Sequence, residues 1–380
     1  MKILQVTTFF HPVVGGVETH VLNLSKELLR LGHKVTVLTS DSKKNGPRIS
    51  EKVSIVSGIH VKRFKTFFSL SYFHKFFPGI LFYLVKADFD LIHVHGFRKL
   101  ETYAAMLIAK LRKKKLVLTT HNPFPVTIRS LKNNLLIKLH DWTLGKLFTR
   151  FIDKIITLLP SEQNILKSGF YVDKKRLITI PNGNDDIFYQ AGNARNFLKE
   201  WSIDKSKWKG LIVSVARINY VKGLQNLEQA VKELHDVLFF FAGGDDGYLT
   251  RLKVLFAECN NVIFSEYFLS QKQLIDLYAA ADVFVLPSLH EPFGIVLLEA
   301  LAQGCPVISA NTGGPGELLS NEFADLLPPK DQNGWKQAIS DLIRNPHLRQ
   351  KMGKKGQAFV QEFKWDKIAK QIEKVYLSLN

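Results

Sequence analysis

The chain has 380 residues, of which 46% are hydrophobic and 23% are charged. This is the ordinary balance of a globular protein, and the length suggests two domains. Two cysteines, Cys259 and Cys305, are too few for a disulfide framework and fit a reducing compartment. We find no run of 18 apolar residues and no signal-peptide cleavage pattern at the N-terminus, so we expect neither a transmembrane helix nor a leader.

The net charge of +18 is concentrated in the first half of the chain. Residues 1–190 hold 30 Lys and Arg against 13 Asp and Glu, a charge of +17, whereas residues 191–380 hold 22 against 21. This asymmetry indicates that the first half meets something anionic, such as a nucleic acid, a phosphorylated substrate or a membrane surface. No recognised nucleic-acid module occurs, so we expect no nucleic-acid partner.

Short apolar runs alternate with helical patterns along the first half. The run at 2–10 leads through a Gly-Gly turn into a helix whose apolar residues recur at helical spacing. They are Val17, Val21, Leu24, Leu28 and Leu31. Later strand candidates lie at 34–40, 60–64, 90–96, 115–121, 154–159 and 176–181. The alternation predicts a parallel sheet with helices on both faces.

A segment at 181–197, rich in Asn, Gly and Asp, is the best linker candidate. The strand and helix rhythm then resumes, with near-continuous apolar strands typical of parallel sheets covered on both faces. These candidates lie at 210–218, 237–244, 261–268, 282–288 and 306–314. We therefore predict an α/β fold of two doubly wound Rossmann-like domains with a cleft between them. The predicted domains are 1–190 and 191–360, with a last helix at 361–380 packing back on the first domain.

Glycine turns follow several predicted strands. Gly15 and Gly16 precede the first helix, Gly243 and Gly244 end a strand, and Gly313 and Gly314 repeat the pattern. Such turns leave helix N-terminal amides uncovered, which favours anions. A plain structural turn is the alternative for each, but several together within one domain favour a nucleotide site.

Arg217 and Lys222 flank the end of the predicted strand at 210–218. A guanidinium can bind a phosphate bidentately and an ammonium acts as a point charge, so this pair suits a diphosphate. A solvated loop with charged residues is the alternative.

The stretch 290–304 places Glu291 and Glu299 around an apolar run. We expect a helix to begin near Phe293 or Gly294, with the amides of Phe293 to Ile295 free to meet a phosphate. A carboxylate is costly to bury without partners, and the two hydroxyls of a sugar diol are suitable donors to one carboxylate. Helix capping by Glu291 and a surface position for Glu299 form the alternative interpretation.

These pieces together resemble the retaining glycosyltransferases of the GT-B fold, family 4. "EPFGIVLLE" is similar to that family's acid-x7-acid motif. The other matching pieces, in the family's order, are "GGVE", "TTHNPF", "PNGNDDIF", "RINYVKG", "AGGDDGYL", "LYAAADVFVLPSLHEPFG" and "NTGGPGEL". The resemblance covers essentially the whole chain.

The resemblance implies a role for each matching residue. Glu299 would bind the donor ribose, Glu291 the transferred sugar, and Arg217 and Lys222 the departing diphosphate, aided by the amides of Phe293, Gly294 and Ile295. His121 would lie near the transferred sugar. The remaining assignments are Gly15 and Gly16 near the donor phosphate or the acceptor, Gly243 in the nucleotide site, and Tyr267 with Phe268 at the base. The sequence departs from the family at Asn122, where many members have Asp, which bears on the surroundings of His121.

The resemblance also implies transfer with retention, by same-face attack assisted by the leaving phosphate, without a covalent nucleophile. We expect no cofactor and no metal, with a UDP- or GDP-sugar as the donor. Asp88 and Asp90 precede a predicted strand instead of ending one, and His93 and His95 alone are too few ligands. The alternatives are a GT-B phosphorylase or epimerase and a non-catalytic nucleotide-sugar-binding subunit.

Residues 62–86 contain nine Phe or Tyr and no acid, and "RKKK" follows at 112–115. Basic residues beside aromatic rings are typical of segments that lie at an anionic membrane surface. A buried aromatic helix with a solvated charge run is the alternative. We expect the N-terminal domain to bind a lipid or lipid-linked acceptor. The transferred group would be a hexose or N-acetylhexosamine, with mannosyl- or glucosyl-type transfer favoured. The protein would then be cytoplasmic and peripheral on the inner face of the cell membrane.

Overall fold

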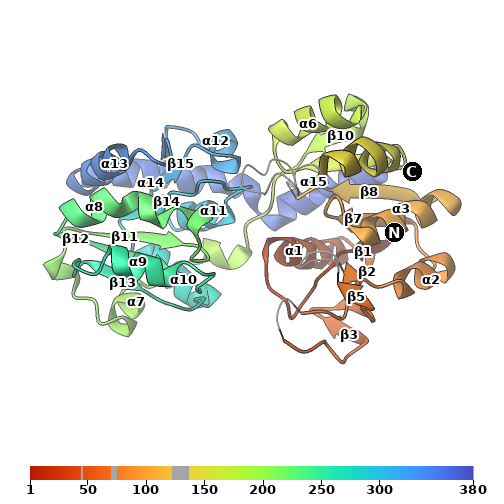
Figure 1. Cartoon of the computed structure of the whole chain (residues 1–380), viewed down its shortest axis with the longest axis horizontal. Coiled ribbons are helices and arrows are strands. Elements are labelled where there is room, and N and C mark those ends of the chain that lie inside the picture. The colour runs from red at the N-terminus through yellow and green to blue at the C-terminus, as the bar shows by residue number, and fades with distance from the viewer. Residues whose placement is uncertain (44–45, 70–74, 122–136, 380) are drawn as a thin grey trace. The chain divides into compact units, whose positions relative to one another are not determined.

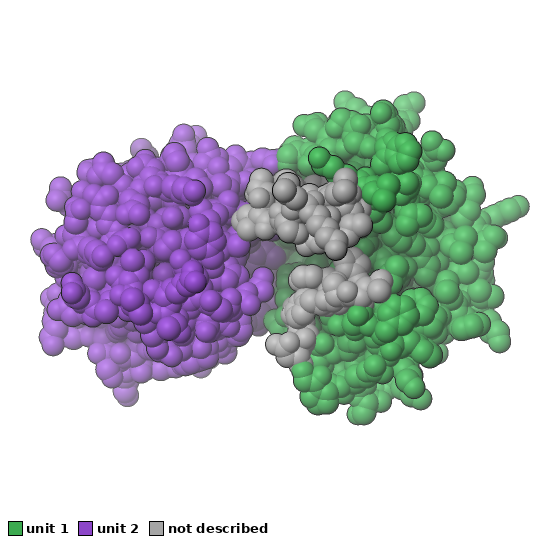
Figure 2. Space-filling model, viewed as in Figure 1, with its two compact units in different colours: residues 1–183, 365–380 green, residues 184–364 purple. Residues whose placement is uncertain are grey.

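The computed structural model describes residues 1–43, 46–69, 75–121 and 137–379. The chain forms two compact units (Figure 2). Unit 1 comprises residues 1–183 and 365–380, and unit 2 comprises residues 184–364.

Unit 1 is built on a sheet in the order β10-β9-β8-β7-β1-β2-β4-β3. Its strands are β1 (Lys2–Val6), β2 (Lys34–Ser40), β3 (Val53–Val56), β4 (Ile59–Phe64), β7 (Leu91–His95), β8 (Lys115–Thr119), β9 (Lys154–Thr157) and β10 (Leu177–Thr179). All neighbouring pairs are parallel except β3 with β4. The strand order reverses between β1 and β7, at the centre of a doubly wound sheet. Figure 1 shows these two strands side by side.

Helices accompany the strands of unit 1, and the longer ones bury an apolar face. They are α1 (Gly16–Arg30), α2 (Gly79–Lys86), α3 (Leu100–Leu111), α5 (Lys146–Thr149), α6 (Pro160–Phe170) and α15 (Trp365–Leu377), with η1 (Asp141–Gly145) and η2 (Lys174–Arg176). On α1, Val21, Leu24 and Leu28 are fully buried. The short strands β5 (Phe68–Ser69) and β6 (Lys75–Phe76) pair with each other.

Unit 2 contains a six-stranded sheet, parallel throughout, in the order β13-β12-β11-β14-β15-β16. Its strands are β11 (Gly210–Val215), β12 (Val237–Ala242), β13 (Val262–Phe264), β14 (Val283–Leu286), β15 (Val307–Ala310) and β16 (Ala324–Leu327). This is the Rossmann order, which reverses between β11 and β14. All six residues of β12, "VLFFFA", are buried, as expected for a strand covered on both faces.

The helices of unit 2 alternate with its strands. They are α7 (Ala194–Glu200), α8 (Glu228–Glu233), α9 (Leu249–Leu255), α10 (Gln271–Ala280), α11 (Ile295–Ala302), α12 (Gly314–Leu318), α13 (Gln332–Arg344) and α14 (Pro346–Val360). Shorter 3-10 turns are η3 (Asp186–Tyr189), η4 (Lys205–Lys207), η5 (Tyr220–Lys222), η6 (Leu224–Leu227) and η7 (Gln361–Phe363). The alternation predicted from the sequence is therefore present in both units.

The unit boundaries differ from those predicted at 190 and 360. The chain enters unit 2 at Asn184 and returns to unit 1 at Trp365. The predicted linker at 181–197 is mostly folded into unit 2, because Phe188 and Phe197 are buried there. Its polar composition reflects turns and caps, such as the Asn193 side chain that accepts the Arg195 N–H. The last helix, α15, packs against α1 within unit 1.

Gly223 lies between η5 and η6, at a left-handed φ of 72°. A Cβ there would lie 1.9 Å from the carbonyl oxygen of Pro287, so the loops after β11 and β14 approach too closely for a side chain. Gly247 has a similar φ of 88° but nothing within 4 Å of its Cβ position.

Substitution of Gly247 and of Gly223 distinguishes the cost of a left-handed backbone from the cost of a steric conflict. Gly247→Ala should lower the free energy of unfolding by about 1–2 kcal/mol, the cost of a left-handed L-residue. Gly223→Ala should lower it by at least about 1 kcal/mol more, because the backbone must also shift. Guanidinium unfolding of the full chain measures both. Equal losses would contradict the close approach.

Candidate active site

The carboxyl ends of β11 and β14 lie side by side at the point where the strand order of unit 2 reverses. The chain leaves β11 through Arg217 and η5, which ends at Lys222. It leaves β14 through a loop that contains Glu291 and ends at α11. Ligands of open α/β sheets bind at such a reversal, so topology brings two of the predicted cations and one predicted acid to the expected place.

Lys222 and Glu291 form an ion pair. Their Nζ and Oε2 atoms lie 2.7 Å apart, and the two side chains are only 19% and 10% exposed. The loops also join through their backbones, since the Leu289 N–H donates to the Val221 carbonyl over 2.8 Å. Because a charge held this far from water needs a partner, each side chain fixes the other.

The loop that carries Glu291 rests on the glycine turn before α12. The Gly314 N–H donates to the carbonyl oxygen of Glu291 over 2.9 Å. A Cβ on Gly313 would lie 2.3 Å from that oxygen, and one on Gly314 would lie 2.5 Å from the Cα of Phe293. The turn at 313–314 therefore lets two backbone segments touch, which is a structural reason for glycine beside its predicted nucleotide role.

Helix α11 begins at Ile295, one or two residues later than predicted, with Gly294 as its N-cap at a φ of 86°. Phe293 is 4% exposed and anchors the loop in the core. The first amides of a helix have no acceptor within that helix, and the helix dipole adds partial positive charge there. Both properties favour an anion at the start of α11.

Glu299 lies inside α11 and is buried, which excludes the surface alternative. Its Oε2 accepts a hydrogen bond from the hydroxyl of Tyr278 on α10, 2.8 Å away. Burial raises the pKa of the Glu299 carboxyl to about 7; the Tyr278 bond lowers it and the charge of Asp185 raises it further. The carboxyl is thus held where additional hydroxyl donors would favour its ionised form.

Arg217 lies beside the pair without joining it. Its Nη1 atom contacts Oδ2 of Asp246 at 3.1 Å, with side chains 59% and 46% exposed. Asn219 also donates to Asp246, and its side-chain oxygen accepts the Lys222 N–H over 3.2 Å. An exposed pair of this kind is weak and can exchange for another anion.

The predicted base contacts are tied to the end of β12. The Gly243 N–H donates to the Ser265 hydroxyl over 2.9 Å, and that hydroxyl donates to the carbonyl of Tyr267 over 2.8 Å. Tyr267 and Phe268 are 50% and 65% exposed. One hydroxyl therefore links two residues that the sequence singled out separately.

The remaining predicted residues belong to unit 1. Gly15 and Gly16 stand at the start of α1; Gly15 has extended backbone and Gly16 has open space around its Cβ position, so neither has a conformational need for glycine. His121 lies two residues after β8, at a φ of 55°. Its Nε2 lies 3.1 Å from Nδ1 of His95. Asn122, the departure from the family pattern, lies outside the described residues.

Two partners of the predicted residues were missed from the sequence. Tyr278 sits in a helix whose apolar pattern hides its polar contact with Glu299. His20 is 1% exposed and packs edge-on against His121, with ring centroids 4.7 Å apart. His20 is four residues before Leu24, on the buried stripe of α1, and a polar residue on such a stripe is the signal that could have found it.

Comparison with known proteins identifies the family of the chain. Residues 14–186 match Glycosyltransferase Family 4, and residues 197–359 match Glycosyl transferases group 1. An uncharacterized glycosyltransferase of Methanocaldococcus jannaschii is 30% identical over 100% of this chain and 99% of its own length. The gpi3 subunit of phosphatidylinositol N-acetylglucosaminyltransferase from Schizosaccharomyces pombe is 29% identical over 99% and 80% of the two chains.

Solved structures show the same fold. HepE from Anabaena, in complex with UDP, superposes with a TM-score of 0.79 at 20% identity over the full length of both chains. Sucrose-phosphate synthase from Thermosynechococcus elongatus gives 0.77 at 21% identity, over 100% of this chain and 99% of its own. The fold is therefore GT-B, as predicted, and this chain is a glycosyltransferase that belongs to family 4, the glycosyl transferases group 1.

Proposed function

We propose that this glycosyltransferase is a retaining, metal-independent hexosyltransferase that uses a UDP- or GDP-sugar and a lipid or lipid-linked acceptor. The transferred sugar is a hexose or an N-acetylhexosamine. The observation that carries the proposal is the largely buried Lys222–Glu291 pair at the strand reversal of unit 2, beside the first amides of α11. This arrangement offers a cation and amides to a diphosphate and a carboxylate to sugar hydroxyls.

Glu299 is the proposed ribose contact. Its Oε2 already accepts one hydrogen bond, and a vicinal diol would supply two further donors. Burial holds the pKa of the Glu299 carboxyl near 7. Hydrogen bonds from the ribose hydroxyls would lower this pKa and so favour the ionised form. Glu291 is eight residues earlier in the chain and receives the transferred sugar in the same scheme.

The two cations are proposed to stabilise the leaving group. The bond from the anomeric carbon to the β-phosphate oxygen breaks, and negative charge gathers on the diphosphate. Lys222 and the amides at the start of α11 stabilise that charge, and Arg217 joins them by exchanging Asp246 for phosphate. The acceptor hydroxyl bonds to the anomeric carbon from the same face and passes its proton to the departing phosphate. No cofactor is needed for this balance.

The relatives support an acceptor with an inositol phosphate group. One is named for phosphatidylinositol, and a second, from Corynebacterium jeikeium, is named D-inositol 3-phosphate glycosyltransferase and is 28% identical over 96% of this chain. Such an acceptor is anionic and fits the charge of +17 carried by residues 1–190. His121, Gly15 and Gly16 keep the roles that the family resemblance implies for them.

Exposed apolar and basic side chains of unit 1 support the proposal that the protein meets its lipid acceptor at a membrane surface. Helix α2 packs on α3, and the ring of Tyr103 in α3 packs on Phe148 in the helical segment 137–149. Large apolar side chains exposed on these three elements are Phe82, Val85, Leu107, Leu111, Leu139, Trp142, Leu144 and Leu147. Lys86, Lys110 and Lys138 belong to the same elements and are exposed as well. We call this set the apolar face. Rings beside lysines suit the boundary of an anionic bilayer.

The apolar face includes only part of the aromatic segment at 62–86. That segment is not a single helix: its described residues divide among β4, β5, β6 and α2, and residues 70–74 lie outside the description. Among the described residues, no helix combines the length and apolar character needed to cross a bilayer.

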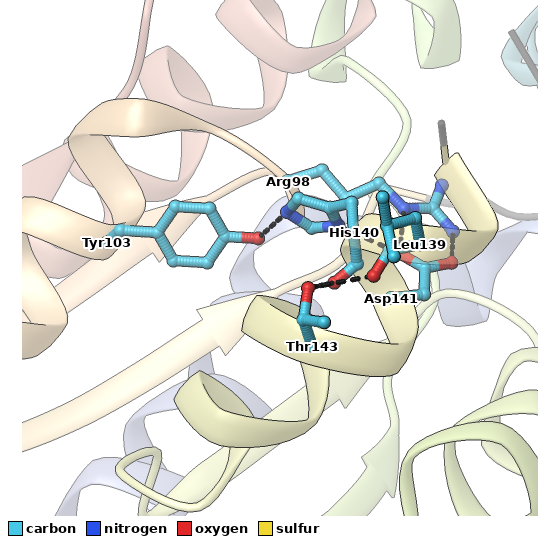
Figure 3. A network of polar contacts seen from close by, with 6 residues as sticks. All are labelled: Arg98, Tyr103, Leu139, His140, Asp141 and Thr143. Carbon is cyan, nitrogen blue, oxygen red and sulfur yellow. Dashed lines mark hydrogen bonds and ion pairs between the residues drawn. The ribbon is translucent and has the colours of Figure 1, made fainter. Parts of the chain in front are cut away.

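A polar network fastens the segment 137–149 to its neighbours (Figure 3). The guanidinium of Arg98 donates two hydrogen bonds, of 2.7 and 2.5 Å, to the carboxylate of Asp141. The same carboxylate accepts a hydrogen bond from Nδ1 of His140. Nε2 of His140 lies 2.5 Å from the hydroxyl of Tyr103 in α3. Because the polar side of this segment is engaged inward, Trp142 and Leu139 remain turned to solvent, where they are 69% and 57% exposed.

Lys222→Met tests the leaving-group role. Hydrolysis of UDP-glucose, UDP-N-acetylglucosamine and GDP-mannose by the unsubstituted protein identifies the donor. NMR of the product shows whether the configuration at the anomeric carbon is retained. With that donor, Lys222→Met should lower kcat by about 10²–10³, the usual loss when a group that stabilises developing charge is removed. Lys232→Met, which breaks an exposed pair with Glu228, is the control and should leave kcat unchanged. Inactivity of the unsubstituted protein with every donor would overturn the proposal.

Glu299→Gln should separate stability from donor binding. A carboxyl whose folded pKa is about 7, above the ordinary 4.5, binds more protons folded than unfolded between those values. Unfolding free energy is therefore lost as pH rises from 4.5 to 7, by up to about 3 kcal/mol. Glu299→Gln should remove this loss, so that relative to the unsubstituted protein it is more stable at pH 8 than at pH 5.

The affinity of Glu299→Gln for UDP or GDP, measured by calorimetry, should fall below that of the unsubstituted protein. Exposed Glu258→Gln is the control, and unchanged affinity in Glu299→Gln would refute the ribose role.

Phe82→Asp and Trp142→Asp test the apolar face. The unsubstituted protein should sediment with vesicles that contain anionic lipid at low salt, and less so as salt screens the charges. Each substitution should reduce the bound fraction, because it places an acid against the lipid boundary. Val254→Asp changes a side chain of unit 2 that is 72% exposed and should bind like the unsubstituted protein. Equal sedimentation of all four proteins, or none by the unsubstituted protein at low salt, would contradict membrane docking.

A further inference from the structure

Four histidine rings gather where the strand order of unit 1 reverses. His20 comes from α1, His93 and His95 from β7, and His121 from the segment after β8. The rings of His20 and His95 are each 1% exposed. The His93 and His95 centroids are 4.2 Å apart, and those of His95 and His121 are 5.3 Å apart. His20, His93 and His95 are buried, and His121 is partly exposed.

One nitrogen from each of His20, His95 and His121 falls within 4.8 Å of the other two. Nδ1 of His95 and Nε2 of His121 lie 3.1 Å apart. Tetrahedral zinc, with bonds of about 2.0–2.1 Å, spaces its ligand atoms by about 3.4 Å. The His95–His121 pair, which is joined by a hydrogen bond, is therefore close to ligand spacing. The His20 nitrogen lies no more than about 1.5 Å beyond that spacing.

The side chains next to His20 and His95 determine which nitrogen of each ring carries a lone pair. The side-chain oxygen of Gln5 lies 2.5 Å from Nε2 of His95, and that of Asn182 lies 2.8 Å from Nδ1 of His20. A carboxamide oxygen only accepts, so those two nitrogens carry the protons. Nδ1 of His95 and Nε2 of His20 are then unprotonated. Oxygen acceptors behind imidazole ligands are the usual outer shell of metal sites.

The inner nitrogen of His20 has an unmet bonding capacity. Nε2 is buried, and no hydrogen-bond partner is found for it in the described parts of the chain. His93 differs, because its two nitrogens contact the hydroxyls of Tyr376 and Thr119 at 2.6 and 2.7 Å. His93 is thus occupied within the fold, whereas His20 presents a lone pair to His95 and His121.

We propose that His20, His95 and His121 form a binding site for a divalent transition-metal ion of the zinc class. The ligands are Nε2 of His20, Nδ1 of His95 and Nε2 of His121, with a fourth position left for water or another donor. Without an ion, the His121 Nε2–H donates a hydrogen bond to Nδ1 of His95. On binding, the ion replaces this proton, and His121 is reprotonated on Nδ1 from solvent, so its ring stays neutral. The ion joins α1 to the ends of β7 and β8. It also engages the Nε2 atom of His121, so metal and sugar contacts at that atom exclude each other.

Metal binding by the chelator-treated full chain tests the site. Titration with Co²⁺ should give visible absorption bands that saturate at one ion per chain, and Zn²⁺ should displace the cobalt. Zn²⁺ should also raise the midpoint of thermal unfolding. His60→Gln, at an exposed histidine of β4, is the control and should behave like the unsubstituted protein.

Variants of the ligands decide the assignment. His20→Phe keeps a buried ring without a lone pair, and His121→Asn suits the left-handed backbone at that position. Each should weaken zinc binding by at least tenfold, and Asn182→Leu, behind His20, should weaken it by about 10–100-fold. Circular dichroism checks folding; if His20→Phe does not fold, His121→Asn decides.

Absence of stoichiometric binding, or binding that survives His121→Asn unchanged, would overturn the site. None of these readouts involves sugar transfer. A failed metal site therefore leaves the proposed transferase function standing, and the reverse holds as well.

Discussion

The cost of taking a carboxylate out of water governs the site of unit 2. Glu291 is held by the ammonium of Lys222, and Glu299 by the hydroxyl of Tyr278. The two acids receive different partners and so differ in character. Glu291 is compensated by a full charge, whereas burial raises the pKa of Glu299 to about 7. A site that keeps one acid incompletely compensated is prepared to accept donors from a ligand.

The backbone around these acids is shaped by the same requirement. Lys222 can reach Glu291 only if the loops after β11 and β14 approach closely, and Gly223 permits this by leaving the Pro287 carbonyl uncovered. Gly313 and Gly314 do the same on the other side of the loop, against Glu291 and Phe293. The glycines of this region thus serve the ion pair through contact between backbones, in addition to any contact with phosphate.

The two sheets reverse at equivalent places but differ in chemistry there. In unit 2 the reversal gathers a cation, a carboxylate and helix amides, which suits a diphosphate sugar. In unit 1 it gathers neutral imidazoles held by the carboxamides of Gln5 and Asn182. The excess positive charge of unit 1 lies elsewhere, and part of it borders the apolar face of α2, α3 and 137–149. The proposed donor site and the proposed membrane-facing surface therefore belong to different units.

Much of the fold could be read from the sequence because its signals are local. Apolar runs such as 237–244 and the helical stripe of α1 indicate strands and helices directly, and "EPFGIVLLE" indicated the acids. Boundaries were less accessible: Phe188 and Phe197 draw the predicted linker into unit 2, and the edge strand β3 alternates too weakly to stand out.

The sequence by itself determined the alternating α/β architecture, the family and the identity of the candidate acids and cations. Only the tertiary structure decided which of them meet. Lys222 and Glu291 are 69 residues apart, and His20 and Asn182 are 162 apart. Such contacts depend on the order of strands in a sheet, which periodicity does not encode. The pairing of Lys222 with Glu291, the raised pKa of Glu299 and the gathering of His20, His95 and His121 all arise at that level, where burial makes each partner necessary.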